Sequence, residues 1–338
     1  MLNWYLQSGK EADVVISTRI RLARNLDEIL FTTKYSLSDA EKIIQIFGNI
    51  IPSLPYELKL LKLKDMDYIT KLSLVEKHII SPNFVTEENE TKAILINEEE
   101  NICIMLNEED HIRIQVLASG LDLENTLGLA VEIDEKLANL INYAYNEKYG
   151  FLTSCPTNVG TGLRSSVMVH LPGLTLTSNI NKVLEVVNNF GMNIRGVYGE
   201  GTKSQGNIYQ ISNKQSLGIS EEEIIKNLKA ITDKIIEQER LARKYLAKNA
   251  IELEDTVCRA YGTLTNCKKI SGEEVKRLLS DVKLGVDMGI IKEITDYKIK
   301  QLETFTKPAN MQKYLGTVLD GYDRDIKRAE VIQKIINE

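Results

Sequence analysis

CPTNVGTGLRSS, residues 155–166, joins a cysteine to a run of glycine and small polar residues and ends in an arginine followed by two serines. The stretch offers a hydrophobic core almost nothing to bury, and loops of this kind on a rigid scaffold often carry binding or catalytic residues. RSSVMVHLP (164–172) continues it with a pattern typical of a β-strand. We therefore expect a loop bearing a thiol to run directly into a strand that begins with an arginine.

Short apolar segments on either side of this loop predict further strands. AILI (93–96) and ICIML (102–106) flank the polar turn NEEEN, and IRIQVL (112–117) follows NEEDH, so these three predict an antiparallel meander. GNIYQISN (206–213) is another expected strand. Helical spacing predicts helices over 123–147 and over 181–191, the second ending at a glycine suited to a helix C-terminus. The fold class is therefore α+β, an antiparallel sheet flanked by helices.

The sequence pattern changes at Ser220, from mixed strands and helices to helices alone. Ser220 and Glu223 form a Ser-x-x-Glu pattern that predicts a charged helix through about residue 249. After it, every periodic segment has helical spacing and none has strand alternation. We expect a catalytic domain over residues 1–250 and an all-helical domain over residues 251–338.

Composition limits the classes of function. With 43% hydrophobic residues in 338, the chain can bury a sizeable core, and 42 basic against 48 acidic residues give no overall positive field for nucleic acid. The start MLNWYLQSGKEAD lacks the pattern of a signal peptide, and no apolar stretch reaches the roughly 18 residues of a membrane span. Four cysteines without a CxxC pair predict free thiols and no zinc site. We expect a cytoplasmic protein that binds neither nucleic acid nor membrane.

Arginines stand out because the usual phosphate-binding motifs, GxxxxGK[ST] and GxGxxG after a strand, are missing. STRIR places Arg19 and Arg21 on one face of an expected strand, Arg113 interrupts an apolar strand, and Arg164 and Arg195 stand beside glycine-containing turns. Each alone is compatible with an ordinary ion pair on a solvated face. Together, arginines at strand ends can hold a polyphosphate through charge-assisted hydrogen bonds.

Carboxylates and a thiol form a second constellation. NEED (107–110) contains Glu108, Glu109 and Asp110, and YGEG contains Glu200. These groups can be no more than solvated loop acids, and Cys155 can be a small buried hydrophobe. The alternative is a pair of carboxylates that grips a planar cation, with Cys155 held as a thiolate beside it.

In chain order, STRIR (17–21), NEEDH-x-R (107–113), CPTN-x-G-T-x-x-R (155–164) and R-G-x-x-G-E (195–200) resemble the catalytic region of the phosphagen (guanidino) kinases, over roughly residues 15–240. RGVYGEG (195–201) and the C-terminal RDIKRA (324–329) make the chain most similar to the bacterial protein-arginine kinases. Small-molecule members carry a helical domain ahead of the arginine pair, whereas 16 residues precede Ser17 here. We therefore expect a site open enough for an arginine of another protein.

The resemblance implies roles for individual residues. Glu109 and Glu200 match the carboxylates that hold the substrate guanidinium, with Glu109 as the expected base, and Cys155 matches the active-site thiol. Gly162 stands where several small-molecule members have a hydroxyl residue. The implied nucleotide-binding residues are Ser17, Thr18, Arg19, Ile20, Arg21, His78, Arg113, Arg164, Ser165, Ser166, Val167, Met168, Arg195, Gly196, Val197, Tyr198, Gly199 and Glu200.

RDIKRA places Arg324 and Arg328 four residues apart on a helix, with Asp325 beside them. Spacing alone fits a surface salt bridge, and the resemblance implies an allosteric pocket for phosphoarginine. It also implies ATP with Mg²⁺ as cofactors, a homodimer, and protein substrates that include a heat-shock repressor. A zinc-binding activator protein and a Clp-type unfoldase and protease of the stress response are the further implied partners.

Three functions follow as alternatives. The favoured one is a protein-arginine kinase that transfers the γ-phosphoryl group of ATP to arginine side chains. The others are a small-molecule guanidino kinase acting on free arginine, and a non-catalytic adaptor that binds phosphoarginine. Loss of Glu109, Glu200 or Cys155 would indicate the adaptor, and all three residues are present.

Overall fold

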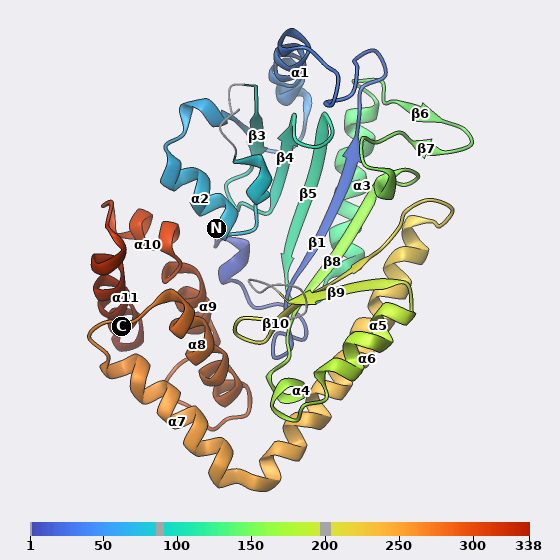
Figure 1. Cartoon of the computed structure of the whole chain (residues 1–338). Helices are drawn as coiled ribbons and strands as arrows, with labels where there is room; N and C mark the ends of the chain where they lie inside the picture. The colour runs from blue at the N-terminus through green and yellow to red at the C-terminus, as the bar shows by residue number, and fades with distance from the viewer. Residues whose placement is uncertain (1, 86–90, 197–203) are drawn as a thin grey trace.

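An antiparallel sheet organises the N-terminal part of the molecule (Figure 1), in a computed structural model that describes residues 2–85, 91–196 and 204–338. Within these residues the sheet has eight strands in the order β2-β3-β4-β5-β1-β8-β10-β9, with every neighbouring pair antiparallel. The strands are β1 (Val15–Arg24), β2 (Lys59–Lys62), β3 (Ala93–Ile96), β4 (Ile102–Leu106), β5 (Ile112–Ser119), β8 (Leu163–His170), β9 (Met192–Gly196) and β10 (Ile208–Asn213). A separate hairpin pairs β6 (Tyr145–Asn146) with β7 (Gly150–Phe151). The predicted meander is confirmed as β3, β4 and β5.

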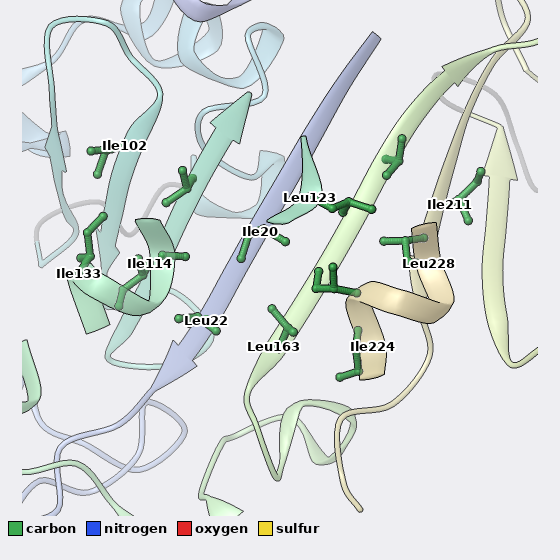
Figure 2. Packing of buried hydrophobic residues seen from close by; sticks show 14 of the residues in the cluster. Ile20, Leu22, Ile102, Ile114, Leu123, Ile133, Leu163, Ile211, Ile224 and Leu228 are labelled. Atoms are coloured by element: carbon green, nitrogen blue, oxygen red, sulfur yellow. The ribbon is translucent and has the colours of Figure 1, made fainter. Parts of the chain in front are cut away.

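One face of the sheet is apolar and covered by helices. Ile20 of β1, Ile114 of β5 and Ile211 of β10 are fully buried on it, against Leu123 of α3 (Leu123–Ala138) and Leu228 of α6 (Glu221–Leu246) (Figure 2). The alternation of strand side chains sends the residues between them to the opposite face. That second face carries the arginines of the chain's central strands.

Six helices accompany the sheet in the described residues: α1 (Leu37–Ile50), α2 (Tyr68–Glu76), α3 (Leu123–Ala138), α4 (Pro172–Leu176), α5 (Ile180–Asn189) and α6 (Glu221–Leu246). α6 begins as expected, with the Ser220 side chain accepting a hydrogen bond from the Glu223 amide. The helix predicted over 123–147 is shorter, because it ends at Ala138 and the chain turns back to the sheet. There the Ala144 amide donates to the Asn25 carbonyl, which competes with continuation of the helix.

The C-terminal part is helical, as expected: α7 (Ala250–Asn266), α8 (Gly272–Asp287), α9 (Asp296–Phe305), α10 (Pro308–Leu315) and α11 (Gly321–Asn337). These helices surround a hydrophobic core of their own, whose members run from Leu253 to Ile336. α6 and α7 form a V in Figure 1 that leads the chain from the sheet into this core. No helix among the described residues combines the length and the apolar character needed to cross a membrane.

Polar contacts join the C-terminal helices to the sheet region. The Glu76 carboxylate at the end of α2 accepts hydrogen bonds from the amides of Ala309 and Asn310, both at 2.8 Å, at the start of α10. His170 at the end of β8 contacts the Ser280 hydroxyl of α8 at 2.8 Å. The C-terminal helices are therefore joined directly to the sheet at β8 and to α2.

Candidate active site

The polar face of the sheet presents a ladder of basic side chains. Along β1, Arg19 and Arg21 alternate with Thr18 and Ile20, which are fully buried on the other face. The strand register sets Arg19 opposite Ser166 and Arg21 opposite Arg164. Like charges directly opposite each other destabilise a sheet, so this arrangement favours an anion between them.

Burial makes the charged forms of these arginines still less favourable. Loss of water around Arg19, followed by the charges of Arg113, Arg195 and Arg164, lowers the pKa of its guanidinium to about 10. The pKa of Arg21 is also held well below its ordinary value by burial and by Arg19, and its Nε atom is buried without a hydrogen-bond partner in the described residues. A bound anion would supply the compensation that these guanidinium groups lack.

Arg113 is occupied by two carboxylates of the preceding turn. Its Nη1 contacts Glu108 Oε1 at 2.7 Å, and its Nη2 contacts Glu109 Oε2 at 2.9 Å. The Glu108 side chain is nearly buried, whereas that of Glu109 is 46% exposed. Of the two, Glu109 is the carboxylate that another cation can reach.

The cysteine loop is held against the same turn. The Ser154 amide donates to Asp110 Oδ1 at 2.6 Å, and the buried Asp110 also accepts from the Asn25 side chain. Cys155 is half-buried, with Sγ 3.1 Å from the Thr157 hydroxyl. The third acid of NEED therefore fixes the position of the thiol, and Glu109 and Cys155 are presented together.

Glycines allow this loop to approach β1. Gly162 has φ +68°, and a Cβ there would lie 2.4 Å from Arg24 Nη1 and 2.6 Å from the Ala23 carbonyl oxygen. A side chain at this position would therefore push the strand away from the loop. The close approach of the loop to β1 therefore explains why position 162 is a glycine and not the hydroxyl residue of several small-molecule members.

A cavity of about 170 Å³ brings the predicted groups together. Its wall contains four of the five predicted arginines, one of the two predicted glutamates and the predicted cysteine: Arg21, Arg113, Arg164, Arg195, Glu109 and Cys155. Burial lowers the pKa of Arg164, and the neighbouring Arg195 adds to the effect. The cavity wall thus holds arginines that can bind an anionic group and a carboxylate that can bind a cationic group.

Comparisons with known proteins agree with this geometry. The family described as ATP:guanido phosphotransferase, C-terminal catalytic domain, matches residues 40–242, and the family described as protein-arginine kinase McsB C-terminal domain matches residues 250–338. A protein-arginine kinase of Bacillus pumilus (strain SAFR-032) is 46% identical over 346 residues, covering 98% of this chain and 92% of that protein. One from Bacillus subtilis (strain 168) is 45% identical with the same coverage. The chain belongs to the protein-arginine kinases of the ATP:guanido phosphotransferase family.

Solved structures give the same fold family. The duplicated taurocyamine kinase of Schistosoma mansoni with bound transition-state-analogue components has a TM-score of 0.61 at 28% identity, over 67% of this chain and 33% of that chain. Lombricine kinase has a TM-score of 0.59 at 25% identity, over 69% of this chain and 68% of that chain. The expected guanidino-kinase fold is therefore confirmed, and the chain spans about a third of the length of the duplicated enzyme.

The implied nucleotide-binding segments divide between the two faces of the sheet in this kinase. The side chains of Ser17, Arg19, Arg21, Arg164, Ser166 and Met168 share the polar face, whereas those of Thr18, Ile20, Ser165 and Val167 lie on the core face. Any role of the second group in binding is limited to the backbone. Gly196 ends β9, and Val197, Tyr198, Gly199 and Glu200 lie outside the described residues.

His78 lies away from the arginine cavity. With Ser17 and Met168 it lines a second cavity of about 300 Å³ between the sheet and the C-terminal helices. Burial, followed by the charges of Lys307 and Arg19, lowers the pKa of His78 well below its ordinary value. The histidine is therefore neutral at pH 7 and suited to contact an uncharged part of a ligand.

One residue that positions the site was not predicted from the sequence. Arg24, at the end of β1, is buried and contacts Asp134 of α3 at 2.7 Å, while its Nη1 donates to the Thr161 carbonyl at 2.9 Å. Its guanidinium also lies 3.5 Å from the centre of the Phe151 ring. Arg24 thus holds the glycine loop that follows Cys155. The sequence signal is that Arg24 falls in phase with Ile20 and Leu22 on the apolar face of the strand, where a charged side chain needs a buried partner.

The RDIKRA residues lie on α11, behind the wall that the C-terminal helices form for the 300 Å³ cavity, which includes Thr306. Arg328 is buried and donates to the carbonyls of Thr306 and Ile270, and it pairs with Asp325 at 2.5 Å. Arg324 is half-buried and makes no side-chain hydrogen bond among the described residues. The sequence predicted two arginines available on one helix face. In the structure Arg324 is accessible, whereas Arg328 is engaged in contacts within the helical domain.

Metal ligands of the chain itself are sparse. Among the described residues, no three His, Cys, Asp or Glu side chains gather in a group that could hold a metal ion. Mg²⁺ in phosphotransferases is bound largely through substrate phosphates and water, with one or two carboxylates. The donors present fit an ion that arrives with the nucleotide.

Proposed function

We propose that this enzyme transfers the γ-phosphoryl group of ATP, as the Mg²⁺ complex, to arginine side chains of other proteins. The observation that supports it most strongly is the 170 Å³ cavity, whose wall holds both Glu109 with Cys155 and a group of arginines. Phosphoryl transfer needs an anionic and a cationic substrate brought together in line, and this wall carries the charges for both.

The arginines act on the phosphoryl group. Charge in the transition state is spread over its equatorial oxygens, and catalysis consists mainly of positioning and electrostatic stabilisation. Arg21, Arg113, Arg164 and Arg195 face the cavity, and Arg19 lies one step along β1, bonded to Ser166 and Gln210. Phosphate oxygens would offset the burial and the mutual repulsion that lower the pKa values of Arg19 and Arg21.

Glu109 acts on the incoming arginine. Removing a proton from a guanidinium with a pKa near 12.5 costs on the order of 7 kcal/mol at neutral pH, so the proton has to leave as the nitrogen attacks. In the described structure Glu109 is paired with Arg113. Phosphate oxygens of the nucleotide compete for Arg113, which frees the Glu109 carboxylate to orient the planar guanidinium and take its proton. Glu200 supplies the second carboxylate, and Cys155 faces the remaining edge.

A comparison of acceptors tests this function. The enzyme is incubated with labelled ATP and either free arginine or an arginine-rich unfolded protein, and acid-labile phosphate is measured on each. We expect label on the protein. Label on free arginine alone would identify a small-molecule guanidino kinase. Tight binding of phosphoarginine without any ATP turnover would identify a non-catalytic adaptor.

The C-terminal region is proposed as a regulatory domain, with the boundary at residue 250. Arg324 and Asp325 offer a guanidinium for the phosphoryl group and a carboxylate for the guanidinium of phosphoarginine, while Arg328 supports them from inside the helix packing. From the family likeness we further propose a cytoplasmic homodimer that acts in the stress response. Its proposed partners are a heat-shock repressor as substrate, a zinc-binding activator protein and a Clp-type unfoldase and protease.

A further inference from the structure

The 300 Å³ cavity beside the arginine ladder has walls from both parts of the chain. Ser17 of β1, Ser119 of β5 and Met168 of β8 are register partners on the polar face of the sheet, and they form its floor. They lie two residues, or about 7 Å, beyond the row of Arg19. A ligand that extends along β1 from the arginines therefore enters this cavity next.

The opposite wall comes from the C-terminal helices. Val275, Leu279 and Ser280 of α8 and Glu303 and Thr304 of α9 line it. Polar contacts hold this wall in place: Ser280 Oγ lies 2.8 Å from both His170 Nε2 and Asn207 Nδ2, and Glu76 caps the start of α10. These contacts therefore fix the wall to the sheet and to α2.

Three polar groups that line this cavity have no hydrogen-bond partner in the part of the chain that the structure describes. The indole Nε1 of Trp4 and the Nδ1 of His170 are buried without hydrogen bonds among the described residues, and both side chains line the cavity. The Glu303 carboxylate is half-buried and likewise makes no hydrogen bond or ion pair with a described residue. Burial raises the pKa of Glu303, although Lys283, Lys307 and Lys300 act against the effect.

The lysines of the cavity are already engaged. Lys77 pairs with Glu100 at 2.8 Å, Lys300 with Asp296 at 2.6 Å, and Lys307 donates to the Glu76 carbonyl at 2.7 Å. A further phosphate would have to displace these partners. An uncharged group with both donors and acceptors matches the free Glu303 oxygens, the Trp4 N–H and the apolar side chains between them.

Ser17, His78 and Met168, which the family resemblance already implies at the nucleotide, line this cavity. We propose that the C-terminal helices complete it and that Glu303 of α9 accepts a hydrogen bond from the nucleoside of ATP. The inference rests on the proposed function for its ligand. It adds residues outside the region that the catalytic-domain family matches. The donor is either the 6-amino group of adenine or a ribose hydroxyl, and both have the same chemistry toward a carboxylate.

Trp4 provides a direct probe because it is the one tryptophan of the chain and lines the cavity. The full-length enzyme is titrated with MgADP while tryptophan fluorescence is followed, and KM for ATP and kcat are measured separately. We expect a saturable fluorescence change in the wild type. In Glu303→Ala we expect Kd and KM to rise about tenfold or more, the usual loss for one hydrogen bond to a charged group, with kcat within about twofold.

Control variants separate a specific loss of nucleotide affinity at Glu303 from a general effect of removing a carboxylate. Glu254→Ala, on an exposed position of α7, should match the wild type. Glu303→Gln keeps the size of the side chain and should show a smaller loss, so it serves if the alanine variant unfolds. Purine riboside triphosphate and 2′-deoxyATP identify the donor, because the analogue that lacks it should bind the wild type and Glu303→Ala equally.

The outcomes are distinct. Unchanged Kd and KM in both Glu303 variants, with phosphorylation intact, would overturn this inference and leave the proposed function standing. Absence of nucleotide binding and of phosphorylation in the wild type would overturn the proposed function itself.

Discussion

Arg21 of β1 and Arg164 of β8 are direct register partners, and both guanidinium groups line the same 170 Å³ cavity. Burial lowers the pKa of each, and neighbouring arginines lower it further. A sheet that places like charges opposite each other sacrifices stability for binding, because an anion is needed to neutralise them.

Removal of one of these charges should therefore stabilise the ligand-free protein. We expect Arg21→Gln to raise the melting temperature without nucleotide by about 2 °C and to abolish the further rise that MgADP causes in the wild type. Arg259→Gln is the matched control, since Arg259 is 78% exposed on α7. A lower melting temperature for Arg21→Gln without ligand would contradict the account of strain.

The two glutamates that pair with Arg113 should behave differently. Glu109→Gln removes the proposed base, and we expect kcat to fall about 10²- to 10⁴-fold while KM for ATP changes little. Glu108→Gln should keep kcat within about tenfold, because Glu108 is buried against Ser81 and Arg113 and faces no substrate. Equal losses of kcat in the two variants would refute the assignment of the base.

Cys155 should be protected by substrates. Alkylation by iodoacetamide, followed by peptide mass spectrometry, should slow at Cys155 when MgADP and an arginine-containing peptide are present, because the thiol lines their cavity. Cys258, which is exposed on α7, gives the internal reference rate. Protection of both cysteines to the same extent would indicate a general effect and not occupation of the site.

Arg24 should contribute mainly to stability and loop position. We expect Arg24→Met to lower the free energy of unfolding by about 3–5 kcal/mol, because Asp134 is left without its partner. Removing both charges in Arg24→Met/Asp134→Leu should recover part of this loss, as measured by urea denaturation. A double variant less stable than the single one would argue against the ion pair as the cause.

His170 should make the free energy of unfolding decrease as the pH falls. Burial, then the charges of Lys283 and Arg243, lowers its pKa well below 6.5 in the folded protein. The unfolded state therefore binds a proton first, so stability from this group is present above about pH 6.5 and is lost as the pH falls below it. We expect the free energy of unfolding to fall less steeply between pH 6.5 and 5 in His170→Gln than in the wild type. Parallel slopes would exclude this role.

Sequence patterns predicted the features that depend on local alternation. The period of STRIR placed Arg19 and Arg21 on one face, and the polar turns between apolar segments predicted β3, β4 and β5. Features that depend on distant contacts were missed. The helix from Leu123 ends early because Ala144 bonds to Asn25, and Arg24 acquires its role from Asp134 and Thr161.

The same limit applies to the candidate site. Residue types predicted the arginines, Glu109 and Cys155, but not that Glu109 pairs with Arg113. The burial of Arg328 follows from carbonyls of two segments, at Ile270 and Thr306, that the helix spacing of RDIKRA does not reveal. The cavity wall at Glu303 depends on how α9 packs against the N-terminal segment, which no local pattern encodes.

A crystal structure with MgADP, nitrate in place of the transferred phosphoryl group and an arginine-containing peptide tests the central claim most directly. We predict that Arg19, Arg21, Arg113, Arg164 and Arg195 contact the phosphates or the nitrate, and that Glu109 and Glu200 both contact the peptide guanidinium. A complex in which the peptide arginine binds away from Glu109, or in which the phosphates avoid the arginine ladder, would contradict the account.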